Sequence, residues 1–459
     1  MATSKIDSAA ARAPIAILGV PFDSVTLDDA LVLTGEMIAS RTPHYATITG
    51  VDFLAETLDD VELRRILFDA HLVLAEDKTV VWASKMLGNE LPGCITIPQF
   101  IPRLLALAEQ NGWRIFFLGI DDATAAKVAA RHPKMKLAGA YRPADAPLLE
   151  MDHAEILRRV REAKPDVLLV AFGSPKQEKW INMNFRELGV PFTLGAGADF
   201  DFASDTGTKK SGNTKFWKFM RAVARQWHRL RARKKGAALP ADAGVMPDPM
   251  GNLIIRAPVK LGAAEAQAFR SEWQRAVENS NVMFDLSATN FIDSTGVGTL
   301  IRLRRRSREM GYQFYLIAPN QTVSAALKLM KLDDFFTIHA SLAGVRILME
   351  SATGSSPVSS GVSSGELQIR WSGEVTVLNA VELGAYTESE LSQATPGTSV
   401  TIDLSRVTFV DSTGIGLMVR FKKNLKRRNV DLKFTNAAGP VRNVVRQTQL
   451  EEFLMGAAA

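Results

Sequence analysis

One short sequence occurs twice in this chain and limits what the chain can fold into. Residues 285–296 read DLSATNFIDSTG and residues 403–414 read DLSRVTFVDSTG, with eight of the twelve positions identical. An apolar segment with high strand propensity leads into each copy, and a basic amphipathic stretch follows it. This pattern predicts a buried strand, a turn and a helix, present in two copies. We therefore expect a duplicated domain in the C-terminal half.

The rest of the chain is long enough for one further domain, since 459 residues correspond to about three domains. Residues 236–251 are rich in Ala, Pro, Gly and Asp, and residues 352–365 are almost pure Ser and Gly. Both segments are typical of linkers, and the second predicts a flexible tether. The expected domains are 14–235, 252–350 and 366–456.

Cysteine usage and hydropathy indicate a protein of the cytoplasm. The only cysteine, Cys94, excludes an internal disulfide and fits a reducing compartment. The N-terminal residues have mixed charge and no long apolar run, so we expect no signal peptide. No stretch approaches the ~18–20 apolar residues that a membrane-spanning helix needs.

The basic charge is concentrated in one segment. Residues 209–235 contain eleven Lys and Arg and no Asp or Glu, so the rest of this +6 chain is mildly acidic. Their apolar residues recur at helical spacing, which predicts a basic amphipathic helix. Such a helix suits the anionic inner face of the cell membrane. The alternatives are packing of the apolar stripe on its own domain and, with no supporting motif, nucleic-acid binding. The predicted stripe is Phe216, Met220, Val223, Trp227 and Leu230, and the predicted membrane contacts are Phe216, Trp217, Arg221, Trp227, Arg229 and Arg231.

Strand-like and helical segments alternate through the first 200 residues. The apolar runs are 44–50, 70–75, 114–119, 166–173 and 191–197. Alternation of this kind predicts βαβ units and a largely parallel, Rossmann-like sheet. Several runs end in glycine, and ligands of parallel sheets bind at the carboxyl ends of strands. The expected site therefore lies near Gly119, Gly173, Gly195 and Gly197.

The two DSTG segments resemble STAS domains, the family of the anti-sigma factor antagonists, and predict two small α/β domains. In that family a partner kinase phosphorylates the serine after the aspartate, and this abolishes partner binding. The resemblance implies phosphorylation of Ser294 and Ser412, beside Asp293 and Asp411. A phosphate there adds about −1.5 to −2 charges and would disrupt an apolar contact face. Alternatively, Ser and Thr only cap the helix, and the two domains only pack together.

The N-terminal part resembles the WecG/TagA/CpsF glycosyltransferases. The matching segments are ILGVPFDSVTLDDAL (17–31), VVWASKMLGNELP (80–92), FFLG (116–119), PLLEMDHAEI (147–156), PDVLLVAFGSPKQEKWI (165–181) and GAGADFDF (195–202). The resemblance implies an inverting, metal-independent hexosyltransferase without a cofactor. It would move an N-acetylaminosugar, such as N-acetylmannosamine, from UDP to a polyprenyl-diphosphate-linked acceptor for exopolysaccharide or cell-wall synthesis. Relatives assemble, and an open sheet edge would allow a homo-oligomer.

The same resemblance assigns site residues. Glu76 aligns with the general base, Asp77 beside it is the alternative base, and Gln177 holds the diphosphate or the donor sugar. The residues expected to bind UDP or the substrate are Thr49, Gly119, Gly173, Ser174, Pro175, Lys176, Glu178, Gly195, Gly197 and Asp201. Asp199 and Asp201 also spell a DxD metal motif, but Asp201 is already explained by the family's Asp-Phe pair. The six histidines lack ligand spacing, so we expect no metal.

Four departures from the family pattern fall in the expected site. The family has Thr-x-Asn where this chain has Ile48-Thr49-Gly50, with Thr47 or Thr49 as substitutes only if the register slips. It has Pro-Asp-Gly where this chain has Ala75-Glu76-Asp77, and Gly-Ser-Asp where this chain has Ile97-Pro98-Gln99. The family's Arg-rich segment reads SDTGTKKSGN. Two main hypotheses follow: a transferase regulated through its STAS pair, or a degenerate nucleotide-sugar sensor whose STAS domains switch partners. A third is a scaffold for other polysaccharide enzymes.

Overall fold

The computed structural model describes residues 13–197, 213–231, 244–248, 251–333, 335–342, 345, 358–363, 366–377, 379–392, 394, 399–448 and 450–456. The chain divides into two units. One contains most of the chain up to Ile347, and the other contains Leu348 onward with the segments Asp145–Met151 and Asn182–Arg186. Each unit is described separately below.

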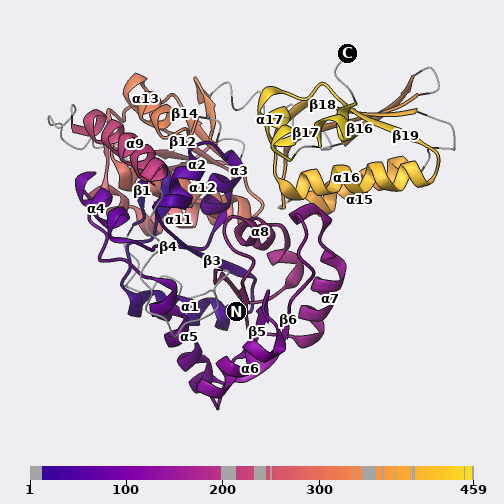
Figure 1. The fold of residues 1–459 in the computed structure, drawn as a ribbon. Helices are drawn as coiled ribbons and strands as arrows, with labels where there is room; N and C mark the ends of the chain where they lie inside the picture. The colour runs from indigo at the N-terminus through magenta and orange to yellow at the C-terminus, as the bar shows by residue number, and fades with distance from the viewer. Residues whose placement is uncertain are drawn as a thin grey trace. The chain divides into compact units, whose positions relative to one another are not determined.

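A six-stranded parallel sheet forms the centre of the N-terminal domain (Figure 1). Its strands are β3 (His44–Thr49), β4 (Leu72–Ala75), β5 (Arg114–Leu118), β6 (Lys136–Tyr141), β7 (Val167–Val170) and β8 (Phe192–Gly195). The order across the sheet is β4-β3-β8-β7-β5-β6, and every pairing is parallel. This confirms the α/β fold class and the Rossmann-like sheet that the alternating sequence predicts.

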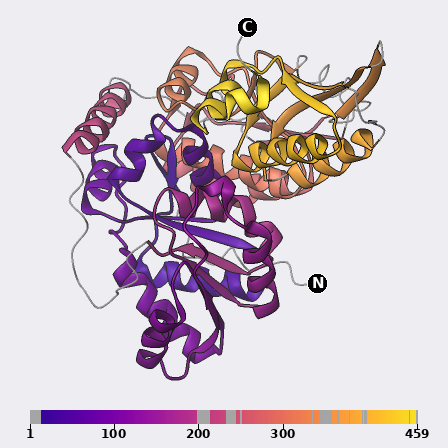
Figure 2. The ribbon, with the colours of Figure 1, turned by 45° about the vertical axis from the view of Figure 1, so that its right-hand side comes forward.

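Helices connect these strands and surround the sheet (Figure 2). They are α1 (Leu27–Ser40), α2 (Val51–Thr57), α3 (Val61–Asp69), α4 (Lys78–Met86), α5 (Ile97–Asn111), α6 (Asp122–Arg131), α7 (His153–Ala163) and α8 (Lys176–Leu188). Alternate residues of the central strands form one core with α1, α5 and α6. Two further elements complete the domain: the antiparallel hairpin of β1 (Ile15–Ile17) and β2 (Val20–Phe22), and the basic helix α9 (Asn213–Arg231).

The first DSTG segment lies in a small α/β domain, here called the first repeat (residues 244–345). Its main sheet has the order β15-β14-β12-β10-β9, and β11 pairs with β13 separately. The strands are β9 (Gly244–Pro247), β10 (Leu253–Arg256), β11 (Lys260–Leu261), β12 (Val282–Asp285), β13 (Phe291–Ile292), β14 (Phe314–Ile317) and β15 (Thr337–His339). The helices are α10 (Ala263–Ala268), α11 (Arg270–Asn279), α12 (Ser294–Glu309) and α13 (Gln321–Leu329).

The second repeat (residues 358–456) carries the second DSTG segment. Its sheet has the order β16-β17-β18-β19, made of β16 (Val358–Ser363), β17 (Glu366–Val375), β18 (Ser399–Val410) and β19 (Asp431–Thr435). The helices are α15 (Ala380–Leu391), α16 (Ser412–Arg427), α17 (Gly439–Gln447) and α18 (Glu451–Met455). In both repeats the DSTG serine is the first residue of a helix, as the repeated pattern predicts.

Both expected linkers contain a strand. Strand β9 belongs to the segment 236–251 and pairs with β10. Strand β16 belongs to the Ser/Gly-rich segment 352–365 and pairs antiparallel with β17 along six residues. The expectation of a tether is therefore wrong for 358–363, because backbone pairing with a neighbouring strand does not depend on apolar side chains.

Candidate functional site at the carboxyl edge of the sheet

The residues expected to form the site follow the carboxyl ends of neighbouring strands. Gly50 follows β3, Glu76 follows β4, Gly197 follows β8 and Gly173 follows β7. Because these strands are parallel and adjacent, all four residues lie along one edge of the sheet. The chain after β7 continues to β8 on one side, whereas the chain after β5 continues to β6 on the other. This divergence creates a switch point, where parallel sheets bind ligands.

Glu76 is the ionisable group whose environment is most suited to proton transfer. It is half-buried directly after β4, and its backbone N–H donates to the carbonyl of Thr49. Burial, followed by the neighbouring carboxylates of Asp77, Glu178 and Asp52, raises the pKa of Glu76 from 4.5 to about 7. A carboxylate with a pKa near neutrality can take and return a proton under physiological conditions.

Asp77 has a different role, because both of its carboxylate oxygens accept backbone hydrogen bonds. Oδ1 accepts from the N–H of Val80 at 3.0 Å, so Asp77 is the N-cap of α4. Oδ2 accepts from the N–H of Val51 at 2.8 Å, at the start of α2. Asp77 thus ties the starts of two helices together, and Glu76 remains as the candidate base.

The departures from the family pattern at positions 50 and 77 are linked, because the two positions lie next to each other. A Cβ at position 50 would lie 2.8 Å from Oδ2 of Asp77 and 3.1 Å from Oε2 of Glu76. The resembling family has a side chain at position 50 and glycine at position 77, whereas this chain has Gly50 and Asp77. The Asp77 side chain therefore occupies space that a residue at 50 would otherwise need.

Gln177 and Glu178 begin α8 and are both buried. Oε1 of Gln177 accepts from the N–H of Gly197 at 3.1 Å, and its Nε2 donates to Oε1 of Glu178 at 2.9 Å. Gln177 therefore fixes the segment after β8 against the start of α8. Burial raises the pKa of Glu178, and its Oε2 has no hydrogen-bond partner among the described residues.

Two glycines allow the close approach on which this arrangement depends. At Gly195 a Cβ would lie 2.6 Å from Nε2 of Gln177. At Gly119, where φ is +106°, a Cβ would lie 2.7 Å from the carbonyl oxygen of Ala171. Any larger residue at Gly195 would displace Gln177. The glycine-ended strands of the sequence thus correspond to tight contacts around the switch point.

The remaining predicted site residues fall into three groups. Thr49 is buried at the end of β3. Ser174 and Pro175, joined by a cis peptide bond, lie between β7 and α8, and Lys176 is the first residue of α8. Asp201 lies outside the described residues, as does the segment SDTGTKKSGN up to residue 212. Sequence reasoning did not name Asp52, which is the third acidic group to raise the pKa of Glu76.

Two further residues that depart from the family pattern, Ile48 and Gln99, have structural roles. Ile48 is 9% exposed and belongs to the core formed with α1 and α5. Gln99 accepts from the N–H of Thr96 at 3.2 Å and completes the capping box of α5. Ile48 therefore contributes to the core, and Gln99 to the start of α5. Thr47, on the opposite face of β3 from Ile48, has a buried hydroxyl with no hydrogen-bond partner among the described residues.

Helix α9 packs on the N-terminal domain through a face that differs from the predicted stripe. Phe219 and Val223 are fully buried, whereas Phe216 and Met220 are half-buried. Gln226 accepts from the N–H of Leu18 at 3.0 Å. The predicted stripe was wrong in omitting Phe219 and Gln226, because helical spacing alone does not separate two adjacent faces.

Part of the expected membrane-contact set is exposed in α9. Trp217 is 57% exposed, and Arg221 is exposed as well. Lys215 and Lys218 pair with Glu56 and Asp59 on and after α2. The side chains of Trp227, Arg229 and Arg231 lie outside the described residues. No helix in the described ranges is long and apolar enough to span a bilayer.

In both DSTG turns the aspartate is the N-cap of the helix that follows. Asp293 accepts from the N–H groups of Thr295 and Gly296, and Asp411 accepts from the N–H of Gly414. Ser294 and Ser412 follow these N-caps, and both are buried. Burial raises the pKa of Asp293. In the described part of the chain, no group of three or more His, Cys, Asp or Glu residues could hold a metal ion.

Each of the three predicted domains matches a known family model. Residues 15–221 match the model of the WecG/TagA/CpsF glycosyl transferase family. Residues 245–345 match the STAS domain model, and residues 360–456 match the Mlab STAS domain model.

Curated relatives cover part of the N-terminal domain. The N-acetylglucosaminyldiphosphoundecaprenol N-acetyl-beta-D-mannosaminyltransferase of Bacillus subtilis (strain 168) is 28% identical over 144 residues. That match covers 30% of this chain and 54% of the relative, so it spans about half of the relative's length. The protein of the same name from Staphylococcus aureus (strain NCTC 8325 / PS 47) is 22% identical over 195 residues, covering 41% of this chain and 75% of that protein.

Two solved structures match shorter parts of the chain. A putative anti-sigma factor antagonist from Thermotoga maritima is 21% identical, covers 24% of this chain and 96% of that one, and has a TM-score of 0.22. The anti-sigma factor antagonist SpoIIAA in its unphosphorylated form is 20% identical over 22% of this chain and 88% of that one, with a TM-score of 0.19. Both TM-scores are low, so neither match supports an inference about function. The family models confirm the predicted composition: this chain is a fusion of a WecG/TagA/CpsF glycosyltransferase-family domain with two STAS domains.

Proposed function

We propose that this protein is a glycosyltransferase in which Glu76 is the general base. The observation that carries the proposal is the half-buried Glu76 carboxylate, with its pKa near 7, at the carboxyl edge of the parallel sheet. Glu76 would take the proton of an acceptor hydroxyl while that oxygen bonds to the anomeric carbon of the donor sugar. The bond between the anomeric carbon and the donor diphosphate breaks, and the nucleoside diphosphate leaves with that electron pair.

Two features of the site suit the donor. Helix α8 begins directly after Gly173-Ser174-Pro175, and the N-terminus of a 13-residue helix favours a diphosphate through its free N–H groups and dipole. Glu178 has a buried oxygen without a hydrogen-bond partner among the described residues, and a sugar hydroxyl or amide could donate to it. Lys176 and Gln177 would keep the start of α8 in place around the diphosphate.

The names of the relatives suggest the substrates. We infer a UDP-N-acetylaminosugar donor, N-acetylmannosamine-like, and an acceptor in which N-acetylglucosamine is joined to a polyprenyl diphosphate. Such an acceptor lies in the membrane, so the exposed Trp217 and Arg221 of α9 would place the protein on the inner membrane surface. The two repeats would report to a serine kinase or an anti-sigma-like protein through Ser294 or Ser412.

The experiment that tests this proposal measures UDP release with and without acceptor. The full-length chain is incubated with a panel of UDP-N-acetylaminosugars and a polyprenyl-diphosphate-GlcNAc analogue. Loss of the base typically costs ~10²–10⁴-fold in rate, so Glu76→Gln is expected to lower turnover by that factor at unchanged UDP affinity. Asp77→Asn, which keeps one of the two acceptor oxygens, is the matched control and should lower turnover much less than Glu76→Gln. Acceptor-dependent release that is equal in Glu76→Gln and the wild type would exclude Glu76 as base.

A second candidate function is a nucleotide-sugar sensor that binds without turnover. The observation that favours it is the loss of two polar groups of the family pattern, replaced by the core residue Ile48 and the helix-capping Gln99. In that case the same assay shows saturable UDP binding and no acceptor-dependent release. The output would then pass through the two repeats by partner switching.

A further inference from the structure

The helix that follows the first DSTG turn is buried against the N-terminal domain. Helix α12 packs against the β1–β2 hairpin and α3, within a core that includes Ala16 and Phe68 of the N-terminal domain. The Phe68 and Phe335 rings lie 4.3 Å apart across this contact. The helix that follows the first DSTG turn is thus covered, in cis, by the N-terminal domain.

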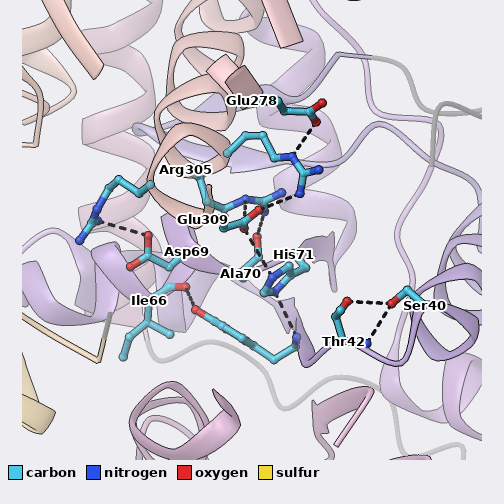
Figure 3. Close-up of polar contacts among 12 residues, drawn as sticks. Ser40, Thr42, Ile66, Asp69, Ala70, His71, Glu278, Arg305 and Glu309 are labelled. Atoms are coloured by element: carbon cyan, nitrogen blue, oxygen red, sulfur yellow. Dashed lines mark hydrogen bonds and ion pairs between the residues drawn. The ribbon is translucent and has the colours of Figure 1, made fainter. Parts of the chain in front are cut away.

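Two arginines of α12 reach the amino-terminal side of β4. Arg302 pairs with Asp23, and Oδ2 of Asp23 accepts from the N–H of Val73 at 2.8 Å. The N–H of Asp23 also donates to the carbonyl of Val73 at 2.9 Å. Arg305 donates to the carbonyl of Ala70, the C-cap residue directly after α3 (Figure 3). Strand β4 is therefore fixed to α12 three residues before Glu76.

His71 extends this contact to the neighbouring strand. Its Nδ1 accepts from the N–H of Tyr45 in β3 at 3.2 Å, so its Nε2 carries the proton in the neutral ring. Nε2 lies 3.5 Å from Oε1 of Glu309, at the end of α12 (Figure 3). Nη1 of Arg308 lies 3.8 Å from Oδ1 of Asp69. The amino ends of β3 and β4 are both attached to the far end of α12.

The opposite end of α12 holds the segment after α4. Nδ2 of Asn89 donates to Oγ of Ser294 at 3.2 Å. The N–H of Asn89 donates to the carbonyl of Ser84, within α4. Helix α4 begins at the N-cap Asp77, which contacts both the start of α2 and the surroundings of Gly50. Helix α12 therefore contacts the β4–α4 segment before and after the residues of the candidate site.

We propose that the first repeat is a built-in clamp that positions the catalytic β4–α4 segment. The claim that the clamp positions Glu76 rests on the proposed transferase function, whereas the contact between α12 and the N-terminal domain does not. Release of α12 would free β4 and the end of α4 together. A displacement of about 1 Å at Glu76 is enough to cost ~10²-fold in rate. The partner of this STAS surface is thus the enzyme domain of the same chain.

The second repeat provides controls at equivalent positions. At Gly298 in α12 a Cβ would lie 2.6 Å from the carbonyl oxygen of Pro14, a backbone atom that side-chain motion cannot move aside. At the equivalent Gly416 the nearest atom to a Cβ is 3.9 Å away. Likewise Arg302 pairs with Asp23, whereas the equivalent Arg420 is exposed. Gly298→Ala and Arg302→Ala test the clamp, and Gly416→Ala and Arg420→Ala make the same chemical changes away from it.

The test is hydrogen–deuterium exchange on the full-length chain, combined with UDP release. We expect Gly298→Ala and Arg302→Ala to speed exchange in peptides covering 72–76 and 84–91 by about tenfold or more, since local opening sets exchange rates. The Gly416 and Arg420 variants should exchange like the wild type in these peptides. Peptides from β12 and β14 report whether the first repeat itself stays folded, and Arg302→Ala remains informative if Gly298→Ala does not fold.

The possible results separate the clamp from the enzyme. Unchanged exchange in 72–76 for both test variants overturns the clamp, whatever the turnover. Faster exchange with no acceptor-dependent release in the wild type supports the clamp and overturns the transferase proposal instead. Faster exchange with unchanged turnover in an active enzyme overturns the positioning claim. Faster exchange with turnover reduced about tenfold or more supports the whole inference.

Discussion

At the scale of single residues, the environment of Glu76 predicts a stability effect that does not depend on activity. The folded protein raises the pKa of Glu76 from its ordinary 4.5 to about 7, so ionising Glu76 opposes folding. This cost is absent below pH 4.5, grows as the pH rises to 7, and is complete above 7. Glu76→Gln cannot ionise and should be more stable than the wild type by about 1–3 kcal/mol at pH 8.5 but not at pH 4.5. Urea unfolding at both pH values measures this, and an equal difference at the two pH values would contradict it.

The close packing of Gly50 and Asp77 predicts that these two positions are coupled. Gly50→Asn places a Cβ 2.8 Å from Oδ2 of Asp77 and should displace it from the N–H of Val51. Asp77→Gly alone removes the N-cap side chain of α4, at a cost of roughly a few tenths of a kcal/mol. The double variant restores the family's residue types at both positions. Its free energy of unfolding should exceed the additive expectation by about 1 kcal/mol or more, as urea unfolding of the four proteins would show. Additive effects would mean that the two departures arose independently.

At the scale of elements, the sequence predicts the type and order of the helices and strands better than it predicts the contacts between them. The five apolar runs predict five of the six parallel strands, because those strands are buried and must be covered by helices. The sixth strand, β6, is exposed or half-buried along its length and has no such run. The Ser/Gly-rich segment predicts a tether and instead contains β16, because main-chain pairing leaves no apolar signal. The separate roles of Glu76 and Asp77 depend on the N–H groups of Val51 and Val80, which no residue pattern identifies. The sequence therefore predicts where the site lies, but not which of Glu76 and Asp77 is the candidate base and which is the helix cap.

The packing of α9 predicts a limited membrane contact. Phe219, Val223 and Gln226 hold one face of the helix on the protein, which leaves Trp217, Arg221 and Arg225 exposed among the described side chains. Trp217→Ser with Arg221→Ser should reduce flotation of the full chain with vesicles containing anionic lipid, and high salt should weaken it further. Phe219→Ser cannot replace these variants in the test, because Phe219 is buried and its loss would disturb the packing of α9 on the protein. Flotation unaffected by both substitutions would mean that α9 is not the membrane-binding element.

At the scale of the whole molecule, the duplication provides two chemically identical serines in different units. Two separate units predict two calorimetric transitions, and UDP should raise only the transition of the unit that binds it. Ser294→Asp puts a charge beside Asp293 and Asn89 within the unit that contains the parallel sheet, so it should lower the transition that UDP raises. Ser412→Asp makes the same change in the second repeat and should lower the other transition. If Ser294→Asp lowered only the transition that is insensitive to UDP, the first repeat would not share a folding unit with the N-terminal domain. A regulator acting at Ser294 could then affect the enzyme only through a separate partner protein.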